Sequence, residues 1–198
     1  MALNLTRYRV MQTLFDSIPV LPYGFSYFPD FITEQEETGL LAVIGKLDLH
    51  PLIFQGFEAK RKVESYGYDY NFDKRTVTKG KAIPEGLIPL VEKVAAFLTI
   101  PAESLAEVLV TEYPVGSVIN WHRDAPPFDM IIGVSLLSDC TFRFRPYDKA
   151  RQNRKSIISF TVNRRSVYVI KDEARTDWEH SISPVKEIRI SVTLRTLR

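Results

Sequence analysis

Two segments in the first half of the chain carry apolar residues at helical spacing. The first follows Thr33-Glu34-Gln35-Glu36, a capping-box pattern that is typical of a helix N-terminus. The second follows Pro84. The apolar positions are Leu40, Val43, Ile44 and Leu47 in the first segment, and Leu87, Leu90, Val91, Val94 and Leu98 in the second. Because this spacing places them on one face, it predicts a helix over about 33–46 and a second helix after Pro84.

From Glu107 onward the pattern changes to short runs rich in β-branched and aromatic residues. Turn-forming residues separate the runs, as in sandwiches and barrels built from many short strands. The predicted strands cover 108–113, 130–137, 141–145, 156–162, 166–171 and 187–197. Helices followed by strands indicate an α+β, mainly β chain. We therefore expect a β-sandwich or jelly roll buttressed on one side by the two early helices.

Composition limits the class of protein. The chain has 198 residues, 45% of them hydrophobic and 25% charged, which is typical of a single globular domain. We expect one domain over 1–198, with residues 1–24 as an N-terminal extension. The single cysteine, Cys140, excludes an intramolecular disulfide framework and a thiolate zinc cluster. No apolar run has the length of a secretion signal or a membrane span, so a cytoplasmic protein is expected, and without an apolar seam a monomer.

The last predicted strand has one fully polar face. Its alternating positions are Ile190, Val192 and Leu194 on one side and Arg189, Ser191, Thr193 and Arg195 on the other. The polar face contacts either solvent or a polar cavity inside the roll. The two arginine Cα atoms lie about 20 Å apart on a straight strand. They would therefore bind a small dicarboxylate from opposite ends, or one would bind it while the other orders a metal ligand or the substrate.

His122-Arg123-Asp124 is the strongest candidate for chemistry. A histidine and a carboxylate two positions apart project to the same side of an extended segment. With His180 as a distant third ligand they complete a 2-His-1-carboxylate triad, which binds iron(II) and leaves positions open for a chelating co-substrate and dioxygen. Taken alone, the short motif also occurs by chance, and a lone histidine is more often structural than a ligand.

In combination and in this order, the motifs resemble those of the AlkB family of 2-oxoglutarate- and iron(II)-dependent dioxygenases, from about Phe25 to the C-terminus. The matching stretches are 111–116, His122-Arg123-Asp124, 133–136, 142–145, 179–182 and 189–195. The resemblance implies a double-stranded β-helix (jelly roll) core. It also implies Fe(II), 2-oxoglutarate and O2 as cofactor and co-substrates, with formaldehyde, CO2 and succinate released when an N-methyl group is hydroxylated.

The resemblance further implies a role for each matching residue. His122, Asp124 and His180 match the iron ligands. Tyr113 matches a tyrosine that hydrogen-bonds 2-oxoglutarate, and Arg189 matches the arginine that pairs with its distal carboxylate. Arg195 matches the second arginine of the closing motif, near the metal and the substrate, which makes it a candidate for catalysis and for co-substrate binding. Thr111 and Ser191 are the remaining candidates for co-substrate contacts.

The substrate is less well defined. Family members that repair bases flip the nucleotide out and stack it on aromatic side chains. The stretch from Lys60-Arg61-Lys62 to Tyr70 resembles their substrate lid, so Arg61, Tyr66 and Tyr68 are candidate substrate contacts. Directly after Asp124, however, Ala125-Pro126-Pro127 stands where a well-known repair enzyme has acidic residues.

The charge distribution does not identify the substrate either. The formal net charge is only +2, but Arg143, Arg145, Lys149, Arg151, Arg154 and Lys155 form a local cluster. Such a cluster either neutralises phosphates or is simply a solvated face. We expect oxidative demethylation of alkylated bases in single-stranded DNA or RNA. The alternatives are an oxygenase that hydroxylates a protein or small molecule, and a nucleic-acid-binding jelly roll without catalysis.

Overall fold

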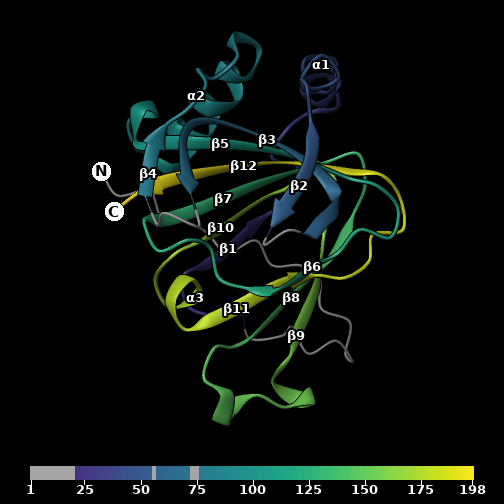
Figure 1. Ribbon diagram of the computed structural model, residues 1–198, viewed down its shortest axis with the longest axis vertical. Coiled ribbons are helices and arrows are strands. Elements are labelled where there is room, and N and C mark those ends of the chain that lie inside the picture. Colours follow the sequence, from purple (N-terminus) through teal and green to yellow (C-terminus); the bar gives the residue numbers. More distant parts are fainter. Residues whose placement is uncertain (1–20, 55–56, 72–75) are drawn as a thin grey trace.

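A computed structural model describes residues 21–54, 57–71 and 76–198. Most of the predicted N-terminal extension, residues 1–20, lies outside this range. Two antiparallel sheets lie one above the other, and two helices cover the outer face of the larger sheet (Figure 1). The helices are α1 (Glu34–Ile44), α2 (Ile88–Leu98) and α3 (Asp172–Thr176). The strands are β1 (Phe25–Phe28), β2 (His50–Phe54), β3 (Phe57–Asn71), β4 (Thr76–Lys79), β5 (Leu105–Tyr113), β6 (Ile119–His122), β7 (Phe128–Leu136), β8 (Cys140–Pro146), β9 (Ile158–Val162), β10 (Val167–Ile170), β11 (Trp178–Ile182) and β12 (Arg189–Leu197).

Both predicted helices are confirmed. Thr33 is the N-cap of α1, and the reciprocal bonds between Thr33 and Glu36 form the predicted capping box. A 3-10 turn over 85–87 precedes α2. A buried carboxylate also ties α1 to the sheet below it, because Glu37 accepts hydrogen bonds from the backbone N–H of Leu137 (2.9 Å) and from Arg164 (2.7 Å).

The larger sheet has the order β1-β10-β7-β12-β5-β3-β2, with β4 paired to β3, and the smaller sheet has the order β6-β11-β8-β9. β12 lies between β5 and β7, so its alternating apolar and polar side chains point to opposite faces of the larger sheet. Ile190, Val192 and Leu194 pack with residues of α1 and α2. Arg189, Ser191, Thr193 and Arg195 therefore face the space between the sheets, and the polar face is interior rather than solvent-exposed.

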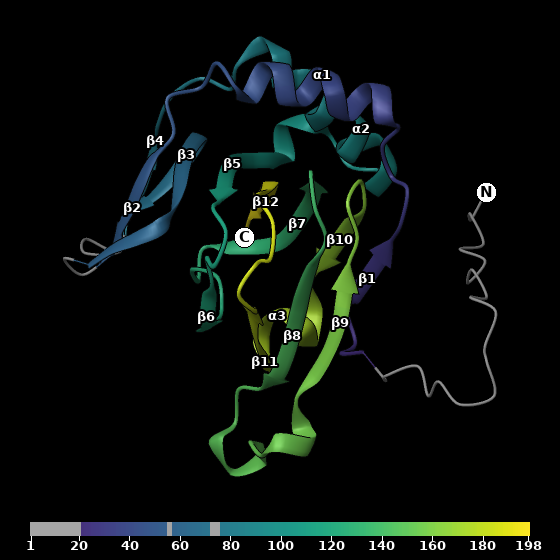
Figure 2. The same ribbon diagram turned by 90° about the vertical axis from the view of Figure 1, so that its right-hand side faces the viewer.

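Two apolar cores fill the fold. One lies between the helices and the larger sheet, and the other lies between the two sheets, where Phe142, Phe144 and Tyr168 pack together. Figure 2 shows this layering from the side, with β2, β3 and β4 at one end of the larger sheet. The expected α+β, mainly β jelly roll is confirmed. Within the described residues, no helix is long and apolar enough to cross a bilayer.

All six predicted strands are present, with ends shifted by a few residues. The pattern did not predict β1, β2, β3, β4, β6, β11 or α3. β11 has the sequence WEHSI, and its buried positions hold Glu179, His180 and Ser181 rather than apolar residues. A strand whose interior positions are polar does not produce the alternation on which strand prediction depends.

Candidate active site

The predicted metal ligands come together where β6 meets β11 in the smaller sheet. His122 in β6 is the ladder partner of His180 in β11, and Asp124 lies two residues beyond His122. One ligand atom from each of the three residues lies within 4.8 Å of the other two. Nε2 of His180 is 3.4 Å from Oδ2 of Asp124. Residues 58 positions apart in sequence thus converge because antiparallel pairing aligns the two histidines.

Each of the two histidines can offer a ring nitrogen to a metal. Nδ1 of His122 lies 2.8 Å from the carbonyl oxygen of Asn120, which fits an Nδ1–H donor and leaves Nε2 with its lone pair. The His180 ring is stacked on Phe142, with centroids 5.4 Å apart. Burial lowers the pKa of His180 to about 3, so its imidazole is neutral at physiological pH.

Asp124 is oriented by Arg195. Oδ1 of Asp124 accepts hydrogen bonds from Nε (3.1 Å) and Nη2 (2.8 Å) of Arg195, and Nη1 of Arg195 donates to Glu107. Burial by itself would raise the pKa of Asp124, but Arg195 and the two histidines bring it below its ordinary value. Oδ2 is buried and has no hydrogen-bond partner among the described residues. An ionised carboxylate with one free oxygen beside two imidazoles fits iron(II).

The segment after Asp124 is held by a buried arginine that sequence analysis missed. Nη2 of Arg175, in α3, donates to the carbonyl oxygens of Asp124 (3.0 Å), Ala125 (2.7 Å) and Phe128 (3.0 Å). Arg175 is only 5% exposed. It thus fixes the path of the backbone around the two prolines. A single arginine in a short polar helix carries no sequence signal for this task.

Arg189 occupies the far end of the polar face. It is fully buried, and its Nε donates to Oγ of Ser135 at 3.1 Å. Its two terminal nitrogens, Nη1 and Nη2, have no partner among the described residues. Its guanidinium also lies over the Tyr113 ring, 4.9 Å from the centroid. Since a buried charge requires a counter-charge, two free parallel donors fit the distal carboxylate of 2-oxoglutarate.

The other predicted co-substrate residues share this face. Tyr113 is the ladder partner of Arg189, and Thr111 is the ladder partner of Ser191. The Ser191 hydroxyl lies 3.5 Å from the hydroxyl of Tyr113. All four side chains are buried. The two arginines of β12 have separate tasks. Arg195 orders the metal ligand Asp124, whereas Arg189 keeps its two terminal nitrogens available for a carboxylate.

Tyr168 also lines this face, and sequence analysis missed it. It is the ladder partner of Gly133, and its ring covers that glycine so closely that an added Cβ would lie 2.1 Å from Cζ. Gly133 lies opposite Thr193 in the next ladder. The glycine therefore lets the Tyr168 ring lie flat beside the polar face. A glycine inside an apolar strand is the one sequence signal for such a close approach.

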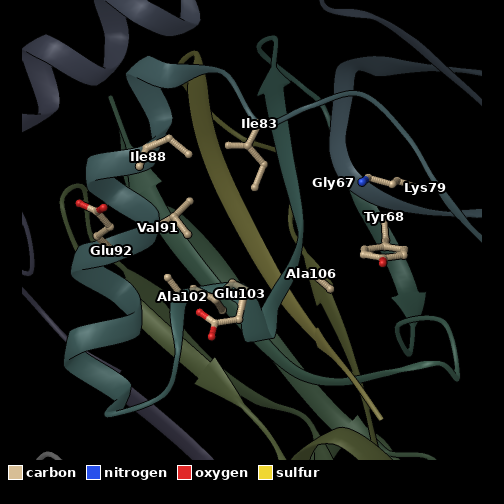
Figure 3. A pocket seen from close by; sticks show the side chains of 11 residues that line it. Gly67, Tyr68, Lys79, Ile83, Ile88, Val91, Glu92, Ala102, Glu103 and Ala106 are labelled. Carbon is tan, nitrogen blue, oxygen red and sulfur yellow. The ribbon is translucent and has the colours of Figure 1, made fainter.

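Of the three predicted substrate contacts, the structure brings one to the site. Arg61 is half-buried on β3, its Nη1 is 3.5 Å from the carbonyl oxygen of Val118, and it lies near Tyr113, which partly opposes the lowering of its pKa by burial. Tyr66 belongs to the core under the helices. Tyr68 lines a pocket beside α2 together with Lys79 and Val91 (Figure 3). Substrate contacts by Tyr66 and Tyr68 stay a prediction, made from positions on the side of α2 rather than beside Tyr113.

Comparison with known proteins agrees with this site. Residues 24–195 match the 2OG-Fe(II) oxygenase superfamily. The chain is 30% identical to the "Alkylated DNA repair protein ALKBH8 homolog" of Arabidopsis thaliana over 96% of its own length, but it spans only 62% of that protein. It is 26% identical to the "Probable RNA/DNA demethylase ALKBH6" of Danio rerio, covering 81% of this chain and 70% of the relative.

A solved structure described as "The structure of OsALKBH1" has the same fold, with a TM-score of 0.67 at 14% identity over 89% of this chain and 98% of that one. The relatives confirm the resemblance to AlkB proteins. The matching region includes all three metal ligands and both arginines of β12. The chain therefore belongs to the 2OG-Fe(II) oxygenase superfamily, whose enzymes use iron(II) and 2-oxoglutarate, and its relatives there are AlkB homologues.

Proposed function

We propose that this oxygenase oxidatively demethylates alkylated bases in single-stranded DNA or RNA and releases formaldehyde, CO2 and succinate. The observation that carries the proposal is the similarity, over most of the chain, to relatives named for alkylated DNA repair and RNA/DNA demethylation. The fold by itself does not distinguish substrates, because one fold hosts many activities.

Each site residue has a defined task in this reaction. His122, Asp124 and His180 would hold iron(II), which supplies the oxidation of the C–H bond when 2-oxoglutarate and O2 are present. Arg189 binds the distal carboxylate of 2-oxoglutarate, and its burial excludes water from that ion pair. Tyr113, Thr111 and Ser191 line the path between Arg189 and the metal ligands.

Arg195 is a positioning residue for Asp124. Its fork fixes Oδ1, so that Oδ2 points toward the two histidines. Arg175 fixes the backbone that follows, and Arg61 lies at the edge of the site, where a charged side chain contacts a nucleotide phosphate or a base edge. A monomer in the cytoplasm is the proposed setting, and light scattering on the purified protein tests the oligomeric state.

A second candidate is a 2-oxoglutarate oxygenase that hydroxylates a protein or a small molecule. Ala125-Pro126-Pro127 favours it, because these residues lack the hydrogen-bonding groups that read a base edge. By contrast, the complete set of metal ligands argues against a purely binding jelly roll.

A panel of methylated single-stranded DNA and RNA oligonucleotides tests the proposal. Formaldehyde release and loss of one methylene mass from the oligonucleotide are expected with iron(II), 2-oxoglutarate and O2, and neither is expected for Asp124→Ala. Succinate formation without loss of mass from any oligonucleotide would exclude this function and favour the second candidate.

A further inference from the structure

The connection between β8 and β9, residues 147–157, extends beyond both sheets at the bottom of Figures 1 and 2. It carries Lys149, Arg151, Arg154 and Lys155 against one acidic residue, Asp148, a net charge of +3 in a chain whose total is +2. All four basic side chains are exposed. The positive charge of the protein is thus concentrated on this protrusion.

These four cations have no carboxylate partner among the residues that the structure describes. Within the described ranges of the chain, none of them takes part in an ion pair, whereas Arg145 at the base of the protrusion is paired with Glu179 at 2.6 Å. The Asp148 carboxylate instead accepts a hydrogen bond from the backbone N–H of Ala150 at 2.9 Å. Unpaired like charges on one loop repel one another, so their concentration here is unfavourable unless a ligand of opposite charge binds them.

The backbone that presents the cations is rigidly braced. It forms two 3-10 turns, over 149–151 and 154–156, each with a side-chain cap. The Asn153 side chain accepts from the N–H groups of Lys155 and Ser156. Nε2 of Gln152 donates to the carbonyl oxygen of Pro146 at 2.9 Å, which closes the base of the loop. Positions fixed in this way reduce the entropy lost on binding a ligand.

The protrusion is also connected to the metal site. The residues on either side of His122 contact its base: the guanidinium groups of Arg143 and Arg145 lie 4.9 and 4.6 Å from the Trp121 ring centroid, and that of Arg123 lies 3.5 Å from the centroid of Tyr147. Tyr147 is 46% exposed. Aromatic and cationic side chains therefore alternate from the strand that carries His122 to the four cations, as on surfaces that bind single-stranded nucleic acid.

We propose that the β8–β9 connection binds the phosphate backbone of the single-stranded nucleic acid whose base is oxidised at the iron site. The inference rests on the proposed function and adds a second contact region to it. Four unpaired cations on a braced loop release counterions when they neutralise phosphates. The aromatic and guanidinium groups along β6 and β8 would contact the nucleic-acid strand between this connection and the metal ligands.

The test measures binding of a labelled single-stranded oligonucleotide by fluorescence anisotropy, without turnover. The variant is Lys149→Gln/Arg151→Gln/Arg154→Gln/Lys155→Gln. Each phosphate contact with a single strand contributes about 0.7 to the slope of log affinity against log salt. Between about 1 M and about 0.15 M salt, this slope corresponds to an increase in affinity of about 4-fold for each contact. Loss of four contacts should therefore weaken binding at about 0.15 M salt by about 200-fold and reduce the salt slope by about 3.

The control is Lys46→Gln/Lys171→Gln, which removes two positive charges away from the protrusion, half as many as the quadruple variant, and should leave both the affinity and the salt slope close to those of wild type. Circular dichroism and succinate formation in the absence of oligonucleotide check that the fold and the iron site are kept. Equal affinity and slope for the quadruple variant and wild type would overturn the inference. If binding depends on the four cations but no methylated oligonucleotide is demethylated, the phosphate contact of the β8–β9 connection stands and the proposed function fails.

Discussion

Replacing Arg189 by methionine should stabilise the apo-protein while destroying its affinity for 2-oxoglutarate. Arg189 is fully buried, and its two terminal nitrogens have no acceptor among the residues that the structure describes. Methionine has a similar length and no charge. Without co-substrate, the wild type therefore bears the cost of an uncompensated buried charge, whereas the variant does not.

The magnitudes follow from the contacts. The hydrogen bond to Ser135 and the Tyr113 ring recover part of the desolvation cost of Arg189. Replacing buried ionic groups by apolar residues of similar volume typically raises the free energy of unfolding by about 1–4 kcal/mol. In a chain of this length, each kcal/mol raises Tm by about 2–4 °C. Truncating one partner of a buried charge pair costs about 2–5 kcal/mol of binding, so Kd for 2-oxoglutarate should rise by about 30-fold to about 5,000-fold.

Calorimetry measures both effects on the same samples. Scanning calorimetry of the metal-free proteins gives Tm, and anaerobic titration of the iron(II) proteins with 2-oxoglutarate gives Kd. Arg143→Met, which alters a half-buried arginine of the smaller sheet, is the control and should leave Kd unchanged. A variant at Arg189 that unfolds at a lower Tm and still binds 2-oxoglutarate as tightly as wild type would refute the argument that this charge is held for a ligand.

Four further predictions concern stability. Glu37→Ala should lower the free energy of unfolding by about 1–3 kcal/mol, because it leaves the backbone N–H of Leu137 without its acceptor while the 42% exposed Arg164 side chain is hydrated; denaturant titration measures it. In the same assay Gly133→Ala should destabilise by about 1–3 kcal/mol, because the new methyl group meets a tyrosine ring. Gly39→Ala meets no neighbouring atom and should stabilise α1 by up to about 1 kcal/mol, so a loss of stability there would contradict the packing. The hydrogen bond from Lys93 and, after it, the capping-box bond from the Thr33 backbone lower the pKa of Glu36 from 4.5 to about 2, so this carboxylate contributes stability above pH 4.5 that is lost as the pH falls toward 2. Because the pair with Lys93 is exposed, Glu36→Gln should reduce the loss of unfolding free energy between pH 4.5 and pH 2 by only about 0.5 kcal/mol, and an unchanged loss would exclude the pair.

The fold and the metal site were predictable where the chain obeys a simple period. The alternation of β12 predicted a polar face before any partner was known, and the two histidines and Asp124 were the right ligand types. The helix over 33–46 was predictable because Thr33 and Glu36 form a local cap. In each case the signal lies within a few residues of the element that it defines.

The remaining features depend on contacts between distant segments. Tyr66 and Tyr68 resemble lid aromatics in the sequence, but the side of β3 on which Tyr66 lies is decided by pairing with β5, which turns Tyr66 toward the helices, and Tyr68 lies in the ladder with β4. β11 escaped prediction because its interior positions are polar. Arg175 escaped because its carbonyl partners, at 124, 125 and 128, are about 50 residues away in sequence. A single sequence does not contain this pairing information.

The most direct test of the central claim is succinate formation from isotopically labelled 2-oxoglutarate by the purified protein with iron(II) and O2. Wild type should form labelled succinate, and His122→Ala, Asp124→Ala and His180→Ala should each abolish it while remaining folded. His50→Ala is the matched control, because His50 is the third histidine of the chain and lies exposed on β2, hydrogen-bonded to the carbonyl oxygen of Asp48. Loss of succinate in the three ligand variants but not in His50→Ala is the predicted result, and full turnover in any ligand variant would contradict the iron site.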